Sequence, residues 1–202
     1  MATTPRSRNR LARWTRTERA VHWVHATAFC ILLGSGLCLY LPSLAEIVGR
    51  RPLLKHIHLY TALAWAIALL LIVAVGDRRA LLRTAREVDR LAVEGRMNRR
   101  QKLNIIVTAA FAILFAVSGF DLWYGERDTQ FRFTNALLIH DWLMYIAFFI
   151  FVGHLYYALI LPSTRHALSG MTRGWVREDW AQKRHPAWVE ELRATNEKGS
   201  DL

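Results

Sequence analysis

The fold is decided by residues 136–161, which read ALLIHDWLMYIAFFIFVGHLYYALIL. This segment is long and apolar enough to cross roughly 30 Å of hydrocarbon as a helix of about 20 residues. It also carries two histidines, His140 and His154. An ionisable side chain inside a membrane helix is costly without a partner, so such residues usually face the bundle interior and mark function. The segment therefore predicts a membrane helix that carries chemistry.

Three further segments have the same length and apolar character, namely residues 20–41, 53–75 and 103–123. We therefore expect an all-α integral membrane four-helix bundle, folded as a single domain over residues 1–202. Its expected parts are an N-terminal tail 1–19, four transmembrane helices within 20–161, an amphipathic loop 77–100 and a C-terminal tail 162–202. In the loop, Leu81, Leu82, Val88 and Leu91 recur at rough helical spacing, which predicts a short helix on the membrane surface.

Composition supports a membrane protein and argues against a nucleic-acid partner. The chain is 53% hydrophobic yet 21% charged, with a formal net charge of +11. Its basic residues lie between long apolar stretches rather than along one polar face, so they indicate membrane topology. Cys30 and Cys38 fall in one apolar stretch, which leaves neither a CxxCH for covalent haem nor the thiolates of an iron–sulfur cluster.

The distribution of Lys and Arg predicts the orientation. Basic residues are dense in the N-terminal tail, which includes Arg6 and Arg8, and in the middle loop, but they are sparse in the other two loops. Both termini and the middle loop are therefore expected in the cytoplasm, with the chain as a multi-pass membrane protein. The first and third helices would run outward.

The histidines fall at two membrane depths. His140 and His154 are fourteen residues apart, which is roughly 21 Å along a helix and about 40° around it, so they share one face. By helix direction, His22 is level with His154, and His58 is level with His140. Two pairs at two depths suit two haems, each with an imidazole on both faces of the iron, and electron transfer is then the natural task. The alternative is that each histidine is a hydrogen-bonded interior residue.

Two further histidines compete for these roles. His25 lies one turn from His22, and His56 lies two residues from His58, so periodicity alone does not choose between them. The small residues Gly34, Gly36 and Gly153 leave room for a porphyrin or for a closely packed helix. Near His58, the basic residues Arg50, Arg51 and Lys55 are expected either to pair with haem propionates or to be ordinary solvated loop charges.

Several motifs together resemble the gamma subunit of membrane-bound formate dehydrogenase, a diheme cytochrome b that passes electrons to quinone. The resemblance covers about residues 16–191 and rests on RAVHW at 19–23, HLYTALA at 58–64, NRRQK at 98–102, LLIH at 137–140, GHLY at 153–156 and GWVREDWAQKRHPAWVEE at 174–191. It implies two haem b groups and a multi-pass protein of a bacterial inner membrane. It also selects His22, His58, His140 and His154 as axial ligands, with His58 and His140 on the outer haem.

The resemblance implies a quinone site, for menaquinone or ubiquinone, on the cytoplasmic side near the inner haem. Asn98 and Gln101 match polar residues of that site, and we expect Lys102 to complete it. Without the resemblance, the same three residues are better interpreted as a polar helix start that needs no ligand. Arg100 departs from the family pattern, which commonly has glycine there.

The family partners are an iron–sulfur beta subunit and a molybdopterin-containing alpha subunit that oxidises formate on the outer face. By resemblance, this chain carries electrons inward from the beta subunit to quinone and does not itself oxidise formate. The competing interpretations are a cytochrome b of a hydrogenase or thiosulfate reductase, a stand-alone quinone oxidoreductase of the b561 kind, and a non-redox anchor or small transporter.

Overall fold

The computed structural model describes residues 9–200, with side chains as far as residue 197. Arg6 and Arg8, which contribute to the orientation prediction, lie outside the described residues. In chain order the long elements are α1 (Arg16–Tyr40), α3 (Arg51–Val75), α5 (Arg99–Tyr124) and α6 (Ala136–Leu155), the last continued by a π-helical turn, η2 (Tyr156–Ile160). The four expected membrane helices are thus confirmed as helices, because within residues 9–200 four helices are long and apolar enough to cross a membrane.

Shorter elements connect and flank these helices. They are β1 (Arg10–Ala12), α2 (Pro42–Val48), α4 (Arg78–Asp89), η1 (Thr129–Phe131), η3 (Arg165–Ala167), α7 (Leu168–Arg173), β2 (Trp175–Arg177), α8 (Glu178–Arg184) and α9 (Pro186–Ser200). The expected amphipathic helix is present as α4. The fold is mostly helical, and within residues 9–200 it departs from the all-α prediction only in β1 and β2, which are too short for a two-residue period to show in the sequence.

The chain packs as two compact units, which we describe separately. The bundle unit comprises Ala20–Arg78 and Ala109–Gly153, and the terminal unit comprises Met1–Arg19, Arg79–Thr108 and His154–Leu202. The expectation of a single domain over the whole chain stays a prediction, and so does the orientation of the termini.

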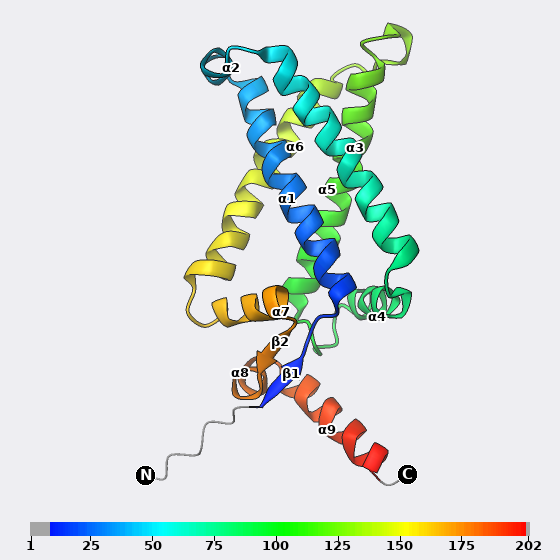
Figure 1. Ribbon diagram of the computed structural model, residues 1–202, viewed down its shortest axis with the longest axis vertical. Coiled ribbons are helices and arrows are strands. Elements are labelled where there is room, and N and C mark those ends of the chain that lie inside the picture. Colours follow the sequence, from blue (N-terminus) through cyan, green and yellow to red (C-terminus); the bar gives the residue numbers. More distant parts are fainter. Residues whose placement is uncertain (1–8, 201–202) are drawn as a thin grey trace. The chain divides into compact units, whose positions relative to one another are not determined.

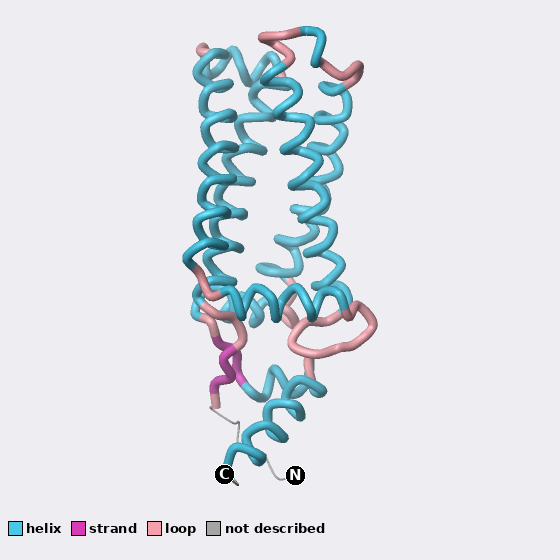
Figure 2. Tube along the Cα trace, turned by 90° about the vertical axis from the view of Figure 1, so that its right-hand side faces the viewer, coloured by secondary structure: helices cyan, strands magenta, loops and turns pink. Residues whose placement is uncertain are grey.

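In the bundle unit, the four long helices lie side by side and alternate in direction (Figures 1 and 2). The reversal between α1 and α3 is made by α2, which begins with Pro42 and ends at Gly49 in the left-handed conformation, φ 67°. Proline suits a first helical position, and glycine adopts positive φ at little cost. Large apolar side chains point outward, such as Leu70 and Phe149, which are 69% and 70% exposed. Such a surface suits hydrocarbon rather than water.

The terminal unit is built on a two-stranded sheet. Strands β1 and β2 pair antiparallel with Leu11 opposite Val176 (Figure 1). A small core of Val176, Ala181, Trp188 and Val189 packs beside them. The N-terminal and C-terminal segments of the chain are therefore held together by backbone pairing and apolar contact.

Candidate cofactor site

Two histidines from different helices face each other in the bundle unit. His58 on α3 and His140 on α6 have ring centres 6.3 Å apart, with ring planes crossing at 68°. Both imidazoles are half-buried. A direct hydrogen bond between two imidazoles would bring their centres to roughly 5 Å. The observed separation is too large for that bond and leaves space for an atom between the rings.

The separation fits a metal with one imidazole on each face. A metal-bound imidazole nitrogen lies about 2 Å from the metal, and the ring centre lies about 1 Å further, so two axial rings stand roughly 6 Å apart centre to centre. The 6.3 Å between His58 and His140 agrees with this value. The two residues present therefore fit the axial ligands of one haem iron.

Each of these imidazoles contacts a serine hydroxyl of another helix. Ser35 Oγ on α1 lies 2.9 Å from Nδ1 of His58, and Ser118 Oγ on α5 lies 2.8 Å from Nδ1 of His140. Both serines are buried. Their neighbours Gly36 and Gly119 lie close to the same rings, because a Cβ at either position would stand 3.5 Å from Cε1 of His58 or His140.

The serines were missed by the sequence prediction. Each precedes a glycine inside an apolar helix, in GSG at 34–36 and SG at 118–119. A hydroxyl in such a helix usually bonds its own backbone, so the pattern by itself does not indicate a histidine partner. Only the packing of α1 against α3 and of α5 against α6 brings hydroxyl and imidazole together.

The remaining histidines have different surroundings. His22 is half-buried and packs against Trp23, with ring centres 5.3 Å apart. His25 packs against Trp65 with ring centres 5.8 Å apart. His56 is exposed and stacks on Tyr60.

His154 is an exposed residue of the terminal unit, whereas His22 belongs to the bundle unit. The pairing of these two residues stays a prediction. Directly after His154, the helix widens into η2, where Leu161 N donates to Tyr156 O at 3.0 Å. Such π-helical turns are frequent at functional sites.

The expected quinone residues lie at the start of α5 and make structural contacts. Asn98 Oδ1 accepts from Gln101 N at 3.0 Å, and Gln101 Oε1 accepts from Asn98 N at 3.1 Å, which is a reciprocal capping box. The Lys102 ammonium is buried and donates to Arg90 O at 2.7 Å and Val93 O at 2.6 Å. Arg100 is exposed. These contacts fix the backbone at this helix start.

A buried polar network surrounds that helix start within the terminal unit. Arg13 donates to Gln101 Oε1 at 3.3 Å, to Arg96 O at 2.9 Å and to His185 Nε2 at 3.1 Å. His185 Nδ1 in turn lies 3.2 Å from Gly95 O. Burial, and then the positive charge of Arg13, lower the pKa of His185 to about 4. His185 is therefore neutral near pH 7.

The other half of this network is a buried ion pair. Arg96 bonds Glu18 at 2.8 Å, and each of these side chains is only 5% exposed. Arg96 also donates to Thr84 Oγ1 at 2.9 Å and bonds Glu87 at 3.2 Å. Burial, and then the charge of Arg96, lower the pKa of Arg13 to about 10, which still leaves Arg13 charged near neutral pH.

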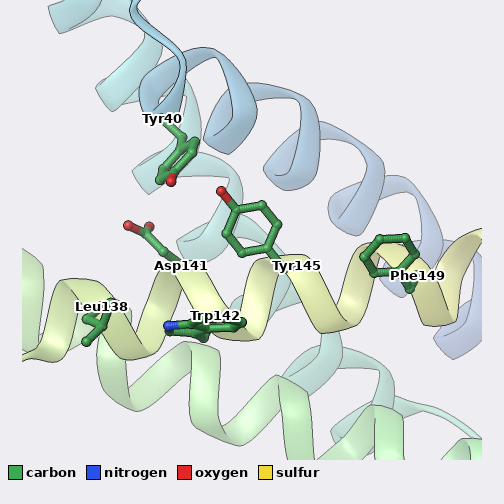
Figure 3. A pocket seen from close by; sticks show the side chains of 6 residues that line it. All are labelled: Tyr40, Leu138, Asp141, Trp142, Tyr145 and Phe149. Atoms are coloured by element: carbon green, nitrogen blue, oxygen red, sulfur yellow. The ribbon is translucent and has the colours of Figure 1, made fainter.

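A wide, aromatic hollow lies along α6 in the bundle unit. Its volume is about 550 Å³, and its lining is formed by Tyr40, Leu138, Asp141, Trp142, Tyr145 and Phe149. Figure 3 shows the Tyr145 hydroxyl pointing toward Tyr40, with the Asp141 carboxylate on the same side of α6. Neither His58 nor His140 lines this hollow.

The fold and the site together define a class of protein: an integral membrane protein whose apolar helices hold a site suited to a haem between two imidazoles. Comparison with known families agrees with this class, since the model of the family described as prokaryotic cytochrome b561 matches residues 13–174. The chain belongs to the prokaryotic cytochrome b561 family. The family implies haem b as the cofactor and electron transport as the general role.

Similar proteins agree with the resemblance found in the sequence. The formate dehydrogenase cytochrome b556(fdo) subunit of Escherichia coli (strain K12) is 29% identical, over 96% of this chain and 99% of that subunit. The formate dehydrogenase cytochrome b556 subunit of Haemophilus influenzae is 23% identical, over 90% of this chain and 83% of its own length. The nitrate-inducible formate dehydrogenase cytochrome b556(Fdn) subunit of Escherichia coli (strain K12) is 22% identical, over 90% of this chain and 91% of that subunit. The resemblance to formate dehydrogenase cytochrome b subunits is thus confirmed.

Proposed function

We propose that this chain is the diheme cytochrome b subunit of a formate dehydrogenase complex in a bacterial inner membrane. It would receive electrons from an iron–sulfur subunit on the outer face and deliver them to quinone near the cytoplasmic side. A separate molybdopterin-containing subunit would oxidise formate. The similarity to named formate dehydrogenase cytochrome subunits over almost the whole chain supports this proposal.

The single observation that carries the haem part of the proposal is the pair formed by His58 and His140, whose ring centres are 6.3 Å apart. We propose that they bind the outer haem, and that His22 and His154 bind the inner haem. When bound, two haems supply one-electron carriers at two depths. The chain's own part is to hold four neutral imidazoles and to keep both iron faces closed to oxygen and substrate.

Purification tests the proposal directly. The full chain, expressed with its neighbouring subunits and extracted in mild detergent, should retain two non-covalent haems and co-purify with iron–sulfur and molybdenum proteins. A haem-to-chain ratio near one would rule out the two-haem arrangement. Co-purification with a nickel-containing partner would instead indicate a hydrogenase, and two haems without any partner would indicate a stand-alone quinone oxidoreductase.

We also propose that quinone is reduced at the start of α5, by the group of Asn98, Gln101 and Lys102, with protons taken from the cytoplasm. A helix start offers free backbone N–H groups and the positive end of the helix dipole, which favour negative charge on a quinone oxygen. The capping box and the bonds of Lys102 hold this backbone in place. The side-chain amide nitrogens of Asn98 and Gln101 would be the donors to the quinone carbonyls.

Rapid-reaction kinetics test this site. Gln101→Ala should slow reoxidation of the haems by quinone while both haems stay bound and reducible from the donor side. Arg99→Ala is the exposed control at the same helix start. If Asn98→Ala and Gln101→Ala both left quinone reduction and its inhibition by quinone analogues unchanged, the site would lie elsewhere, and the outer face near His58 would be the next candidate.

A further inference from the structure

We propose that Ser35 and Ser118 are positioning residues that hold His58 and His140 in the tautomer that leaves Nε2 free to bind an iron. The inference rests on the proposed haem between these two histidines. It adds two residues, from two further helices, to that site. A ligand histidine commonly bonds its second ring nitrogen to a carboxylate, a carbonyl or water; here both second partners are hydroxyls.

The hydrogen bonds of each serine fix where its proton lies. Ser35 Oγ lies 2.8 Å from Ile31 O, and Ser118 Oγ lies 2.7 Å from Leu114 O. A carbonyl only accepts, so each hydroxyl donates its single proton to its own helix. Toward the imidazole, each Oγ can then only accept.

The tautomer of each histidine follows from that direction. Because Oγ accepts, Nδ1 of His58 and of His140 carries the ring hydrogen and donates it to serine at 2.9 Å and 2.8 Å. A neutral imidazole has one N–H, so Nε2 keeps its lone pair. The Nε2 atoms of His58 and His140 can then bind one iron between them, each from its own side.

The arrangement uses all four long helices. The histidines come from α3 and α6, and the serines come from α1 and α5, so the site joins the four long helices of the bundle unit. Both Ser–Gly dipeptides contact their imidazole in the same way, with glycine beside Cε1 of the ring. This repeated contact on two unrelated helix pairs favours a role for the hydroxyls beyond helix packing.

The test compares variants that remove the serine hydroxyls with variants that keep them. Ser35→Ala, Ser118→Ala and the double variant remove the hydroxyls. Ser35→Thr and Ser118→Thr are the matched controls, because threonine keeps the hydroxyl at the same position. The full-length chain is purified in mild detergent and its two haems are followed by redox titration and by haem retention on dilution.

The serine variants should raise the midpoint potential of the outer haem and weaken its binding. The potential and the binding of the inner haem should not change. Without an acceptor at Nδ1 the imidazole is a weaker donor to ferric iron, and its other tautomer competes. Each single change should alter the reduced-to-oxidised ratio roughly threefold, and the double change about tenfold, or about 59 mV. Haem affinity should fall by roughly 10-fold or more. Ser35→Thr and Ser118→Thr, which keep the hydroxyl, should restore the potential.

Two results would overturn the inference: an unchanged outer potential and haem affinity in Ser35→Ala/Ser118→Ala, or equal effects of Ser35→Thr and Ser118→Thr. The proposed function is tested separately with His58→Ala. If that variant loses one haem while the serine variants behave as the parent, only the positioning role fails. If His58→Ala keeps both haems, the ligand assignment itself fails.

Discussion

The bundle unit and the terminal unit differ in how their buried polar side chains are hydrogen-bonded. In the bundle unit, the buried side chains of Ser35 and Ser118 each bond one imidazole and their own helix, and buried Asp121 accepts from Phe133 N. In the terminal unit, Arg13, Arg96 and His185 are buried together in one connected network. The bundle unit thus pairs its buried polar groups separately, whereas the terminal unit joins groups from distant parts of the chain in one network.

The largest effects are expected from substitutions of the proposed haem-binding histidines. We expect His58→Ala to remove one haem and His22→Ala to remove the other, because the two residues belong to different proposed pairs. Pyridine haemochrome analysis and low-temperature spectra of the purified variants measure the loss. His25→Ala and His56→Ala are matched controls one turn and two residues away. Were the controls to lose a haem while His22→Ala and His58→Ala kept both, the ligand assignment would be wrong.

The second prediction concerns the buried ion pair between Arg96 and Glu18 in the terminal unit. Arg96→Met should destabilise this unit by about 3–5 kcal/mol, because Glu18 is left charged and buried without its partner. Chemical unfolding followed by tryptophan fluorescence measures the loss, since Arg96 lies 4.3 Å above the ring of Trp14. Arg100→Met, exposed on the same helix start, should change little.

A double variant separates the effect of the Arg96 charge from the effect of its packing. Glu18→Gln combined with Arg96→Met removes the uncompensated charge and should recover part of the lost stability. Equal losses in the single and double variants would mean that packing of the Arg96 side chain, rather than its charge, stabilises the unit.

The third test is the pH dependence of the terminal unit. The pKa of His185 is lowered from 6.5 to about 4 in the folded chain, so the unfolded chain binds its proton first as the pH falls. Stability from this residue is therefore complete above about pH 6.5 and is lost progressively as the pH falls toward 4, by about 1–3 kcal/mol. His185→Gln keeps a donor and an acceptor but does not titrate. The stability difference between His185→Gln and the parent should change across this pH range, and a constant difference would contradict the prediction.

The length and apolar character of four segments made the membrane helices predictable from sequence, and helical spacing of apolar residues did the same for α4. Helix arithmetic paired His58 with His140, and the structure places their ring centres 6.3 Å apart. The contacts of Ser35 and His185 were not predictable, because they join residues far apart in the chain and depend on tertiary packing. Strands β1 and β2 were not predicted for a different reason. Each has three residues, which are too few to show the two-residue alternation of apolar and polar side chains.

The smallest effect is expected at the ion pair between Lys55 and Glu126 in the bundle unit. The two groups lie 2.5 Å apart, but their side chains are 55% and 51% exposed. Exposed pairs contribute about 0–1 kcal/mol, because water screens the charges and the long side chains lose freedom. A double-mutant cycle with Lys55→Gln and Glu126→Gln should therefore give a coupling below about 1 kcal/mol in thermal unfolding, falling further at high salt. The same variants also test whether Lys55, with Arg50 and Arg51, pairs with haem propionates. Because Lys55 bonds Glu126, we expect Lys55→Gln to leave the midpoint potential of the outer haem unchanged. A shift of that potential in Lys55→Gln but not in Glu126→Gln would assign Lys55 to the propionates instead.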